Sequence, residues 1–189
     1  MAKLKLLIGL GNPDEEYYLT RHNVGFMMLD YLAKRNDSGE FELEKKFNAL
    51  VSKGKMETAP VVLVKPLCYV NKSGEVAIKV KNFYKVKPED VILIHDDLDI
   101  EFGNFKLSFD KNSGGHKGVE SVMKSLKTKK FYRLRIGTQN SALKKAYKFS
   151  EKKKDEAIKD FVLGKFSKKE TEELKTIFKA ASERLSELL

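Results

Sequence analysis

The chain has 189 residues, of which 41% are hydrophobic and 34% charged, and it carries a net charge of +10. This length suits one domain with a sizeable core, and the sequence contains no apolar run near the ~20 residues of a transmembrane helix. The single cysteine, Cys68, excludes an intrachain disulfide and a cysteine-based zinc site. Because the N-terminus lacks the apolar segment of a signal peptide, we expect a cytoplasmic protein.

The excess positive charge lies in one segment. Residues 117–154 contain thirteen Lys and Arg against two Glu, a local balance of +11, whereas the rest of the chain sums to −1. Lysine clusters of this density favour a polyanionic partner such as nucleic acid, because each neutralised phosphate releases counterions. A lysine-rich surface that only aids solubility fits the same count, so charge alone leaves both interpretations open.

Apolar runs alternate with helical patterns along the chain. Strands are predicted at 4–10, once or twice within 41–64, at 91–94 and at 131–136, where Arg133 and Arg135 share a face. Helices are predicted from an N-cap at Thr20 to the turn residues 36–39, from Ser73 through Val76, Val80 and Phe83, and after Gly118 through Val119, Val122, Met123 and Leu126.

The end of the chain has the clearest helical pattern. Ser167 and Glu170 form a capping box, and the apolar stripe that follows contains Leu174, Ile177, Phe178, Ala181, Leu185 and Leu188. We therefore predict a helix at about 167–189. Strands that alternate with helices predict a single α/β domain over 1–189, with a twisted, mixed, largely parallel sheet covered by helices on both faces.

Three polar residues follow predicted strands. Asn12 comes after the first strand, Asn71 after residues 61–64, and Asp96 after residues 91–94. Ligands of open α/β sheets bind outside the carboxyl ends of the strands, so these side chains are expected to line one crevice. Asn and Asp are also common in this position because they suit turns.

His22 lies in the first turn of a predicted helix. A helix N-terminus disfavours the imidazolium, which would keep this base neutral near neutral pH. Asp96, if close, would accept the proton of the other ring nitrogen, fix the tautomer and raise the basicity. A histidine and a distant aspartate are also compatible with a structural role.

Several other chemistries lack their motifs. Asp14 occupies the place of the third glycine of a dinucleotide fingerprint, and the sequence contains neither a P-loop nor a G-x-S-x-G elbow. The aspartates at 96, 97 and 99 lack the spacing of a calcium loop. We therefore predict no cofactor, no metal and no covalent nucleophile.

Several longer motifs follow one another over nearly the whole chain. They are Gly9-Leu10-Gly11-Asn12-Pro13 with Tyr17, Thr20-Arg21-His22-Asn23 with Gly25-Phe26, Lys65-Pro66 with Asn71-Lys72-Ser73-Gly74, His95-Asp96-Asp97-Leu98-Asp99, Gly114-Gly115-His116, Arg133-Leu134-Arg135-Ile136-Gly137, and Phe161-Val162-Leu163-Gly164-Lys165-Phe166. In this order they resemble the motifs of bacterial peptidyl-tRNA hydrolase.

The resemblance implies hydrolysis of the ester between a peptide and the terminal ribose of tRNA, which recycles tRNA from abandoned translation products. It implies His22 as the general base, Asp96 as its orienting partner, and Asn12 as a holder of the attacked carbonyl. The residues implied in substrate binding are Tyr17, Tyr69, Asn71, His116 and Lys117, and those implied in tRNA binding are Lys127, Lys129, Lys130 and Arg133. The partner is peptidyl-tRNA, and the protein is expected to be a monomer.

Three positions depart from the family pattern. Asp14 replaces a usual glycine, Val70 an expected methionine, and Lys117 an expected asparagine. The change at Lys117 turns an amide that donates and accepts into a charged donor, which suits a phosphate contact. Residues 138–154 also differ from the family's usual loop, and their structure is not predicted.

Two other functions fit parts of the sequence. An RNA-binding homologue without turnover would need neither His22 nor Asp96, and both are present. A small-molecule esterase would leave the +11 segment without a purpose.

Overall fold

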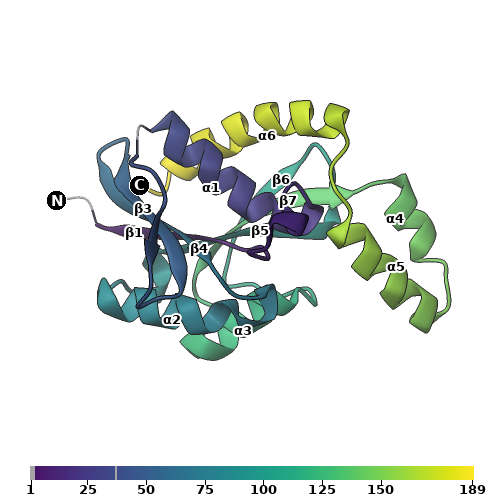
Figure 1. The fold of residues 1–189 in the computed structure, drawn as a ribbon, viewed down its shortest axis with the longest axis horizontal. Helices are drawn as coiled ribbons and strands as arrows, with labels where there is room; N and C mark the ends of the chain where they lie inside the picture. Colours follow the sequence, from purple (N-terminus) through teal and green to yellow (C-terminus); the bar gives the residue numbers. More distant parts are fainter. Residues whose placement is uncertain (1–2, 37) are drawn as a thin grey trace.

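The computed structural model describes residues 3–36 and 38–189. Seven strands form one sheet: β1 (Lys5–Gly9), β2 (Glu42–Glu44), β3 (Ala49–Met56), β4 (Ala59–Pro66), β5 (Val91–Glu101), β6 (Phe105–Phe109) and β7 (Tyr132–Gln139). Their order is β2-β3-β4-β1-β5-β7-β6. The predicted single α/β fold with a mixed sheet is thus confirmed (Figure 1).

The four central strands are parallel, and the outer strands are antiparallel. β1 pairs in parallel with β4 and β5, and β5 with β7, whereas β2, β3 and β6 join by antiparallel pairing. Parallel strands are covered on both faces, which explains the continuous apolar run Leu6–Ile8, where every side chain is fully buried. The antiparallel edge strand β6 was not predicted, because it has no continuous apolar run.

The described part of the chain contains six α-helices. They are α1 (Val24–Arg35), α2 (Ser73–Phe83), α3 (Lys117–Leu126), α4 (Ser141–Ala146), α5 (Glu151–Leu163) and α6 (Lys168–Ser186). α1 and α6 cover one face, α2 and α3 the other, and α4 and α5 extend from one end as an arm (Figure 1). Among the described residues, no helix has the length and apolarity needed to cross a bilayer.

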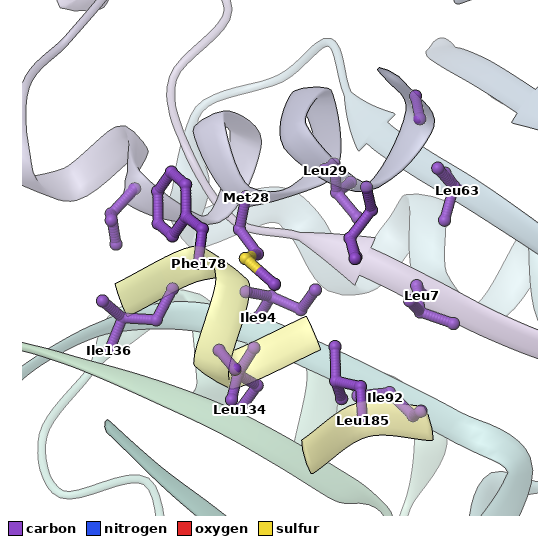
Figure 2. Close-up of a cluster of buried hydrophobic side chains, with 14 of the residues drawn as sticks. Leu7, Met28, Leu29, Leu63, Ile92, Ile94, Leu134, Ile136, Phe178 and Leu185 are labelled. Atoms are coloured by element: carbon purple, nitrogen blue, oxygen red, sulfur yellow. The ribbon is translucent and has the colours of Figure 1, made fainter. Parts of the chain in front are cut away.

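The predicted C-terminal helix is confirmed with its capping box. The Ser167 hydroxyl accepts from the Glu170 amide, and the Glu170 carboxylate accepts from the Ser167 amide. The apolar stripe of α6 packs on α1 and the sheet: Figure 2 shows Phe178 beside Met28, and Leu185 beside Ile92.

Two helical predictions need correction. Thr20 does not cap α1: it precedes a 3₁₀ turn, Arg21–Asn23, and its hydroxyl donates to the Tyr17 carbonyl. Phe83, predicted on the buried stripe of α2, is 54% exposed. α1 ends at Arg35, next to the predicted stop at 36–39, of which Asp37 lies outside the described residues.

α4 and α5 occupy most of the stretch whose structure was not predicted. Every residue of α5 is at least partly exposed, and its first turns are rich in lysine. A helix that buries little apolar surface leaves a weak periodic pattern in the sequence.

Candidate active site

Three elements meet at the carboxyl ends of the central strands. The 3₁₀ turn before α1 carries His22, β5 carries Asp96, and His116 directly precedes α3. The close approach of α1 to the sheet depends on Gly25, since a Cβ there would collide with the carbonyl oxygen of Ile94 on β5. This packing holds the turn beside Asp96.

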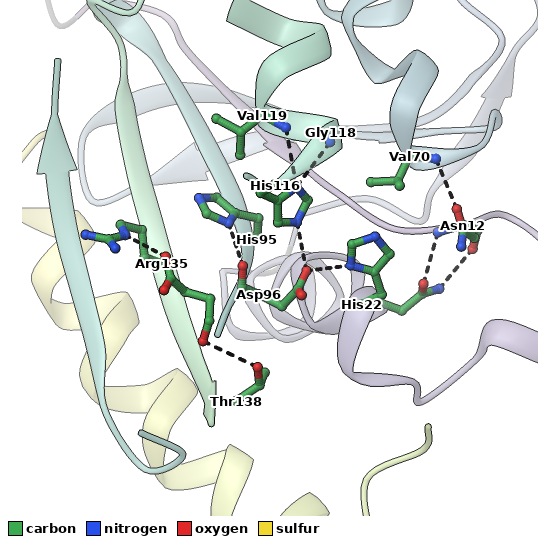
Figure 3. A network of polar contacts seen from close by, with 12 residues as sticks. Asn12, His22, Val70, His95, Asp96, His116, Gly118, Val119, Arg135 and Thr138 are labelled. Atoms are coloured by element: carbon green, nitrogen blue, oxygen red, sulfur yellow. Dashed lines mark hydrogen bonds and ion pairs between the residues drawn. The ribbon is translucent and has the colours of Figure 1, made fainter. Parts of the chain in front are cut away.

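Asp96 is the centre of the site. It lies inside β5, paired with Ile136 of β7, and not in a loop after the strand as predicted. Its Oδ1 atom accepts from Nδ1 of His22 at 2.8 Å and from Nε2 of His116 at 2.9 Å (Figure 3). Burial of the carboxyl raises its pKa, but the two facing rings outweigh burial and hold the pKa well below its ordinary value.

His116 has a fixed tautomer. Its Nδ1 accepts from the amides of Gly118 and Val119 at 3.1 and 3.4 Å, so His116 is the N-cap of α3. Nδ1 must therefore be unprotonated, and Nε2 carries the proton donated to Asp96. The cap therefore fixes which nitrogen of His116 faces α3 and which faces Asp96.

His22 has the complementary arrangement. Its Nδ1 donates to Asp96, which leaves Nε2 as an acceptor. Burial lowers the pKa of His22, but the negative charge and hydrogen bond of Asp96 raise it more, and the net shift is upward. The raised pKa agrees with the predicted effect of Asp96 on the basicity of His22, and the carboxylate outweighs the opposite effect expected from a helix N-terminus.

The side chain of Asn12 is held so that its Nδ2 group is free to donate a hydrogen bond. Its main chain exchanges two hydrogen bonds of 2.9 Å with the Asn23 side chain, and its Oδ1 accepts from the Val70 amide at 3.0 Å. Since Oδ1 is engaged, Nδ2 is the group left to donate. Asn23 was missed as a site residue, although it stands in the Thr20–Asn23 motif.

His95 was also missed. It is fully buried, and its Nδ1 donates to the Asp96 carbonyl at 2.7 Å. The ring meets that of His116 at a centroid distance of 4.8 Å. Burial, with the nearby His116, holds the pKa of His95 well below its ordinary value, so this ring is neutral.

Other predicted substrate contacts lie outside this hydrogen-bonded group. Asn71 is exposed and lines a shallow hollow with Lys117 and Lys124, on the α3 side. Tyr17 is half-buried, and Tyr69 is 53% exposed. Hydrogen bonds join His22 and His116 to Asp96, and Asn12 to Val70, the residue directly before Asn71.

The predicted tRNA-binding residues divide into two kinds. Lys127, Lys129 and Lys130 are exposed in and after the C-terminal turn of α3. Arg133 is only 2% exposed, and its Nη2 donates to the Asn112 carbonyl at 2.8 Å. The side chain lies beneath the surface because β7 is an interior strand, which conflicts with a direct phosphate contact.

Two sets of side chains contain atoms of the kinds that bind metals. His22, Asp96 and His116 have ligand atoms within 4.8 Å of one another, but the ring nitrogens that face Asp96 donate protons to it, and the remaining nitrogen of His116 caps α3. Asp97 accepts from Nε of Arg135 at 2.7 Å. The possible ligand atoms of His22, Asp96 and His116 are thus hydrogen-bonded to one another, and the lone pair of Nδ1 of His116 accepts from the amides of α3.

A histidine oriented by a buried aspartate, at the carboxyl edge of an α/β sheet, is an arrangement that hydrolases use to activate water. Comparison with known proteins narrows the class. A family model described as peptidyl-tRNA hydrolase matches residues 6–189. The chain therefore belongs to the peptidyl-tRNA hydrolase family of enzymes, in its bacterial form.

Individual members of this family are similar to the chain over nearly its whole length. The chain is 43% identical to the peptidyl-tRNA hydrolase of Mycobacterium ulcerans over 97% of its own length and 90% of the relative. It is 38% identical to that of Bacillus thuringiensis over 98% and 93%. The crystal structure of the Acinetobacter baumannii enzyme superposes with a TM-score of 0.85 at 31% identity, covering 98% and 88% of the two chains.

Proposed function

We propose that this chain hydrolyses peptidyl-tRNA with a water molecule activated by His22. The observation that carries the mechanism is the 2.8 Å bond from Nδ1 of His22 to buried Asp96, which leaves Nε2 ready to take a proton. A positioned base of this kind contributes ~10²- to 10⁴-fold to a rate.

The chemistry needs one base that later acts as an acid. Nε2 of His22 removes a proton from water as the oxygen attacks the ester carbonyl carbon. The bond from that carbon to the ribose oxygen then breaks, and the proton on Nε2 passes to the leaving ribose oxygen. The products are a peptide carboxylic acid, which loses its proton to solvent, and a tRNA with a free terminal hydroxyl, and His22 returns to its neutral form.

His116 supports this cycle from the other side of Asp96. Because its Nδ1 accepts from the amides at the start of α3, its Nε2 is the atom that donates a hydrogen bond to Asp96. The negative charge of Asp96 is thereby reserved for the imidazolium of His22. This position argues for a role in holding Asp96, beyond the predicted contact with substrate.

Asn12 is suited to stabilise the developing oxyanion. Its carboxamide is fixed by Val70 and its main chain by Asn23, so Nδ2 is preorganised as a donor. One such donor contributes ~10²- to 10³-fold. A pocket of about 160 Å³ beside Asn12, walled by Phe26, Met27 and Leu67, offers apolar surface to the peptide.

The tRNA would be held by exposed lysines. Lys117 and Lys124 are exposed on α3, Lys127, Lys129 and Lys130 are exposed directly after it, and further exposed lysines lie on the α4–α5 arm. Phosphate contacts position a nucleic acid without reading its sequence. Action as a cytoplasmic monomer without a metal remains our prediction.

The test is release of free tRNA from an N-acetylated aminoacyl-tRNA, without added metal, by the native chain and by His22→Ala. We expect turnover by the native chain only, with tRNA affinity retained in the variant. Tight binding without turnover by either protein would favour the non-catalytic RNA-binding alternative. Equal turnover by both would remove His22 from its role.

A further inference from the structure

Arg21, the residue before His22, joins the catalytic turn to a distant part of the chain. Its guanidinium donates from Nη1 to the Lys165 carbonyl at 3.2 Å and from Nη2 to both oxygens of Glu170 at 3.3 Å. It also stacks over the rings of Phe161 and Phe166, at 4.6 and 5.5 Å. These residues belong to the end of α5, the start of α6 and the link between them.

The main chain makes the same connection. The Arg21 amide donates to the Gly164 carbonyl at 3.0 Å, and the Phe166 amide donates to the Leu19 carbonyl at 2.9 Å. Thr20 and Lys165 form an antiparallel bridge between these two bonds. The turn that carries His22 is therefore one strand of a short ladder, and the α5–α6 link is the other.

Glu170, which accepts the hydrogen bonds of Arg21, is itself held in place. Glu170 occupies the third position of α6 and closes the capping box with Ser167. Burial raises the pKa of Glu170, but the bonds from Ser167 and Arg21 outweigh it and lower the pKa. α6 is anchored in the core near this end by Leu174 and Phe178, so Arg21 is attached to a rigid support.

Arg21 is more buried than an ion pair for stability alone requires. Its side chain is 12% exposed, and its Nε is buried without a hydrogen-bond partner among the described residues. An unsatisfied buried N–H costs ~1–3 kcal/mol.

We propose that Arg21 is a positioning residue for the hydrolysis, which locks the turn carrying His22 against the α5–α6 link. This inference rests on the proposed function of His22. Because the planar guanidinium is held by a bidentate pair and by two rings, the turn has one orientation, and His22 can reach Asp96 at hydrogen-bond distance. Misplacement of a catalytic group by ~1 Å can cost ~10²-fold in rate.

The decisive variant is Arg21→Lys, which keeps the charge but loses the fork and the stacking. We expect kcat per folded molecule to fall by ~10- to 100-fold with KM within ~2-fold. If Arg21 acts through the His22–Asp96 pair, adding Arg21→Lys to Asp96→Asn should cost at most a further ~2-fold. Losses that multiply in the double variant would overturn the proposal.

A second readout does not depend on turnover. NMR titration of the His22 ring should give a lower pKa in Arg21→Lys than in the native chain, because the contact with Asp96 that raises it is weakened. An unchanged His22 titration would contradict the proposal. If the native chain releases no tRNA, the proposed function fails, and this titration still decides whether Arg21 positions His22.

Two variants separate positioning from stability. Leu185→Ala removes a fully buried side chain of α6 away from Arg21 and should lower Tm while leaving kcat per folded molecule and the His22 titration unchanged. Glu170→Gln keeps an oxygen for the capping box but removes the charge that Arg21 binds. It should repeat the effects of Arg21→Lys in smaller measure, and it serves in its place if that variant does not fold. Effects in Leu185→Ala equal to those of Arg21→Lys would reduce Arg21 to a structural role.

Discussion

Asp96 and the lysines after α3 hold charge in opposite ways. Asp96 is 1% exposed, with both hydrogen-bonding rings fixed by backbone packing or by an N-cap. Lys127, Lys129 and Lys130 are exposed, so solvent and salt screen their charges. A buried charge interacts strongly with the groups that are hydrogen-bonded to it. Exposed charges each interact weakly with a partner, but many of them add up. The first arrangement suits chemistry on one ester, and the second suits a grip on a long polyanion.

The largest effect is expected from Asp96→Asn. An amide keeps the size but removes the charge that stabilises the His22 imidazolium, and turnover should fall by ~10³-fold or more. Single-turnover cleavage of N-acetylaminoacyl-tRNA measures the loss, and tRNA affinity should change little. An Asp96→Asn protein of native rate would show that the buried charge has no part in the chemistry.

Asn12→Ala should have the next largest effect. It removes the Nδ2 donor and the bond to the Val70 amide, and kcat should fall by ~10²- to 10³-fold. Asn23→Ala is the matched control, because it loosens the Asn12 main chain but leaves the carboxamide in place. A smaller loss in Asn23→Ala than in Asn12→Ala is expected, and the reverse order would move the donor role away from Asn12.

Charge reversal of Lys129 and Lys130 should weaken the binding of tRNA and leave the rate of ester hydrolysis in the bound complex unchanged. We expect about tenfold lower tRNA affinity near 0.1 M salt and a salt slope shallower by roughly 2, since each phosphate contact contributes about 0.9. Titration of affinity against salt concentration measures both. The control reverses two exposed lysines of α6, Lys169 and Lys179, with the same change in net charge. Equal losses in both double variants would mean that only the net charge matters.

Arg133→Met should have the smallest effect on binding. Because this side chain is buried and bonded to the Asn112 carbonyl, its loss should lower the free energy of unfolding by ~1–3 kcal/mol and leave the salt slope unchanged. Denaturant titration and the same salt series measure the two quantities. A shallower dependence of tRNA affinity on salt, with an unchanged free energy of unfolding, would instead support the tRNA contact that the sequence predicted for Arg133.

The fold was predictable where burial leaves a pattern. β1 was found because a central parallel strand is apolar on both faces, and α6 because its stripe repeats over five turns behind a capping box. β6 and α5 were missed because both are largely exposed. Arg133 was assigned to the surface because alternation along β7 cannot tell an interior strand from an edge strand.

The site was predictable in part for a related reason. The rule that ligands meet strand ends placed Asn12 and Asp96 near one another, and the family motif added His22. The bond from His116 to Asp96 depends on how α3 packs, and no sequence spacing encodes it. Asn71 follows its strand as expected, but it lies in a 3₁₀ turn (Val70–Lys72) that leads into α2 and turns the side chain to solvent.

The most direct test of the account is the pH dependence of single-turnover cleavage by the native chain and Asp96→Asn. The base must be neutral, so the rate should fall as pH drops through the pKa of His22, which Asp96 raises above its ordinary value. Removing the carboxylate removes that elevation while burial still lowers the pKa, so the acid limb of the slower variant should move to lower pH. An acid limb at the same pH in both proteins would contradict the claim that Asp96 sets the basicity of His22.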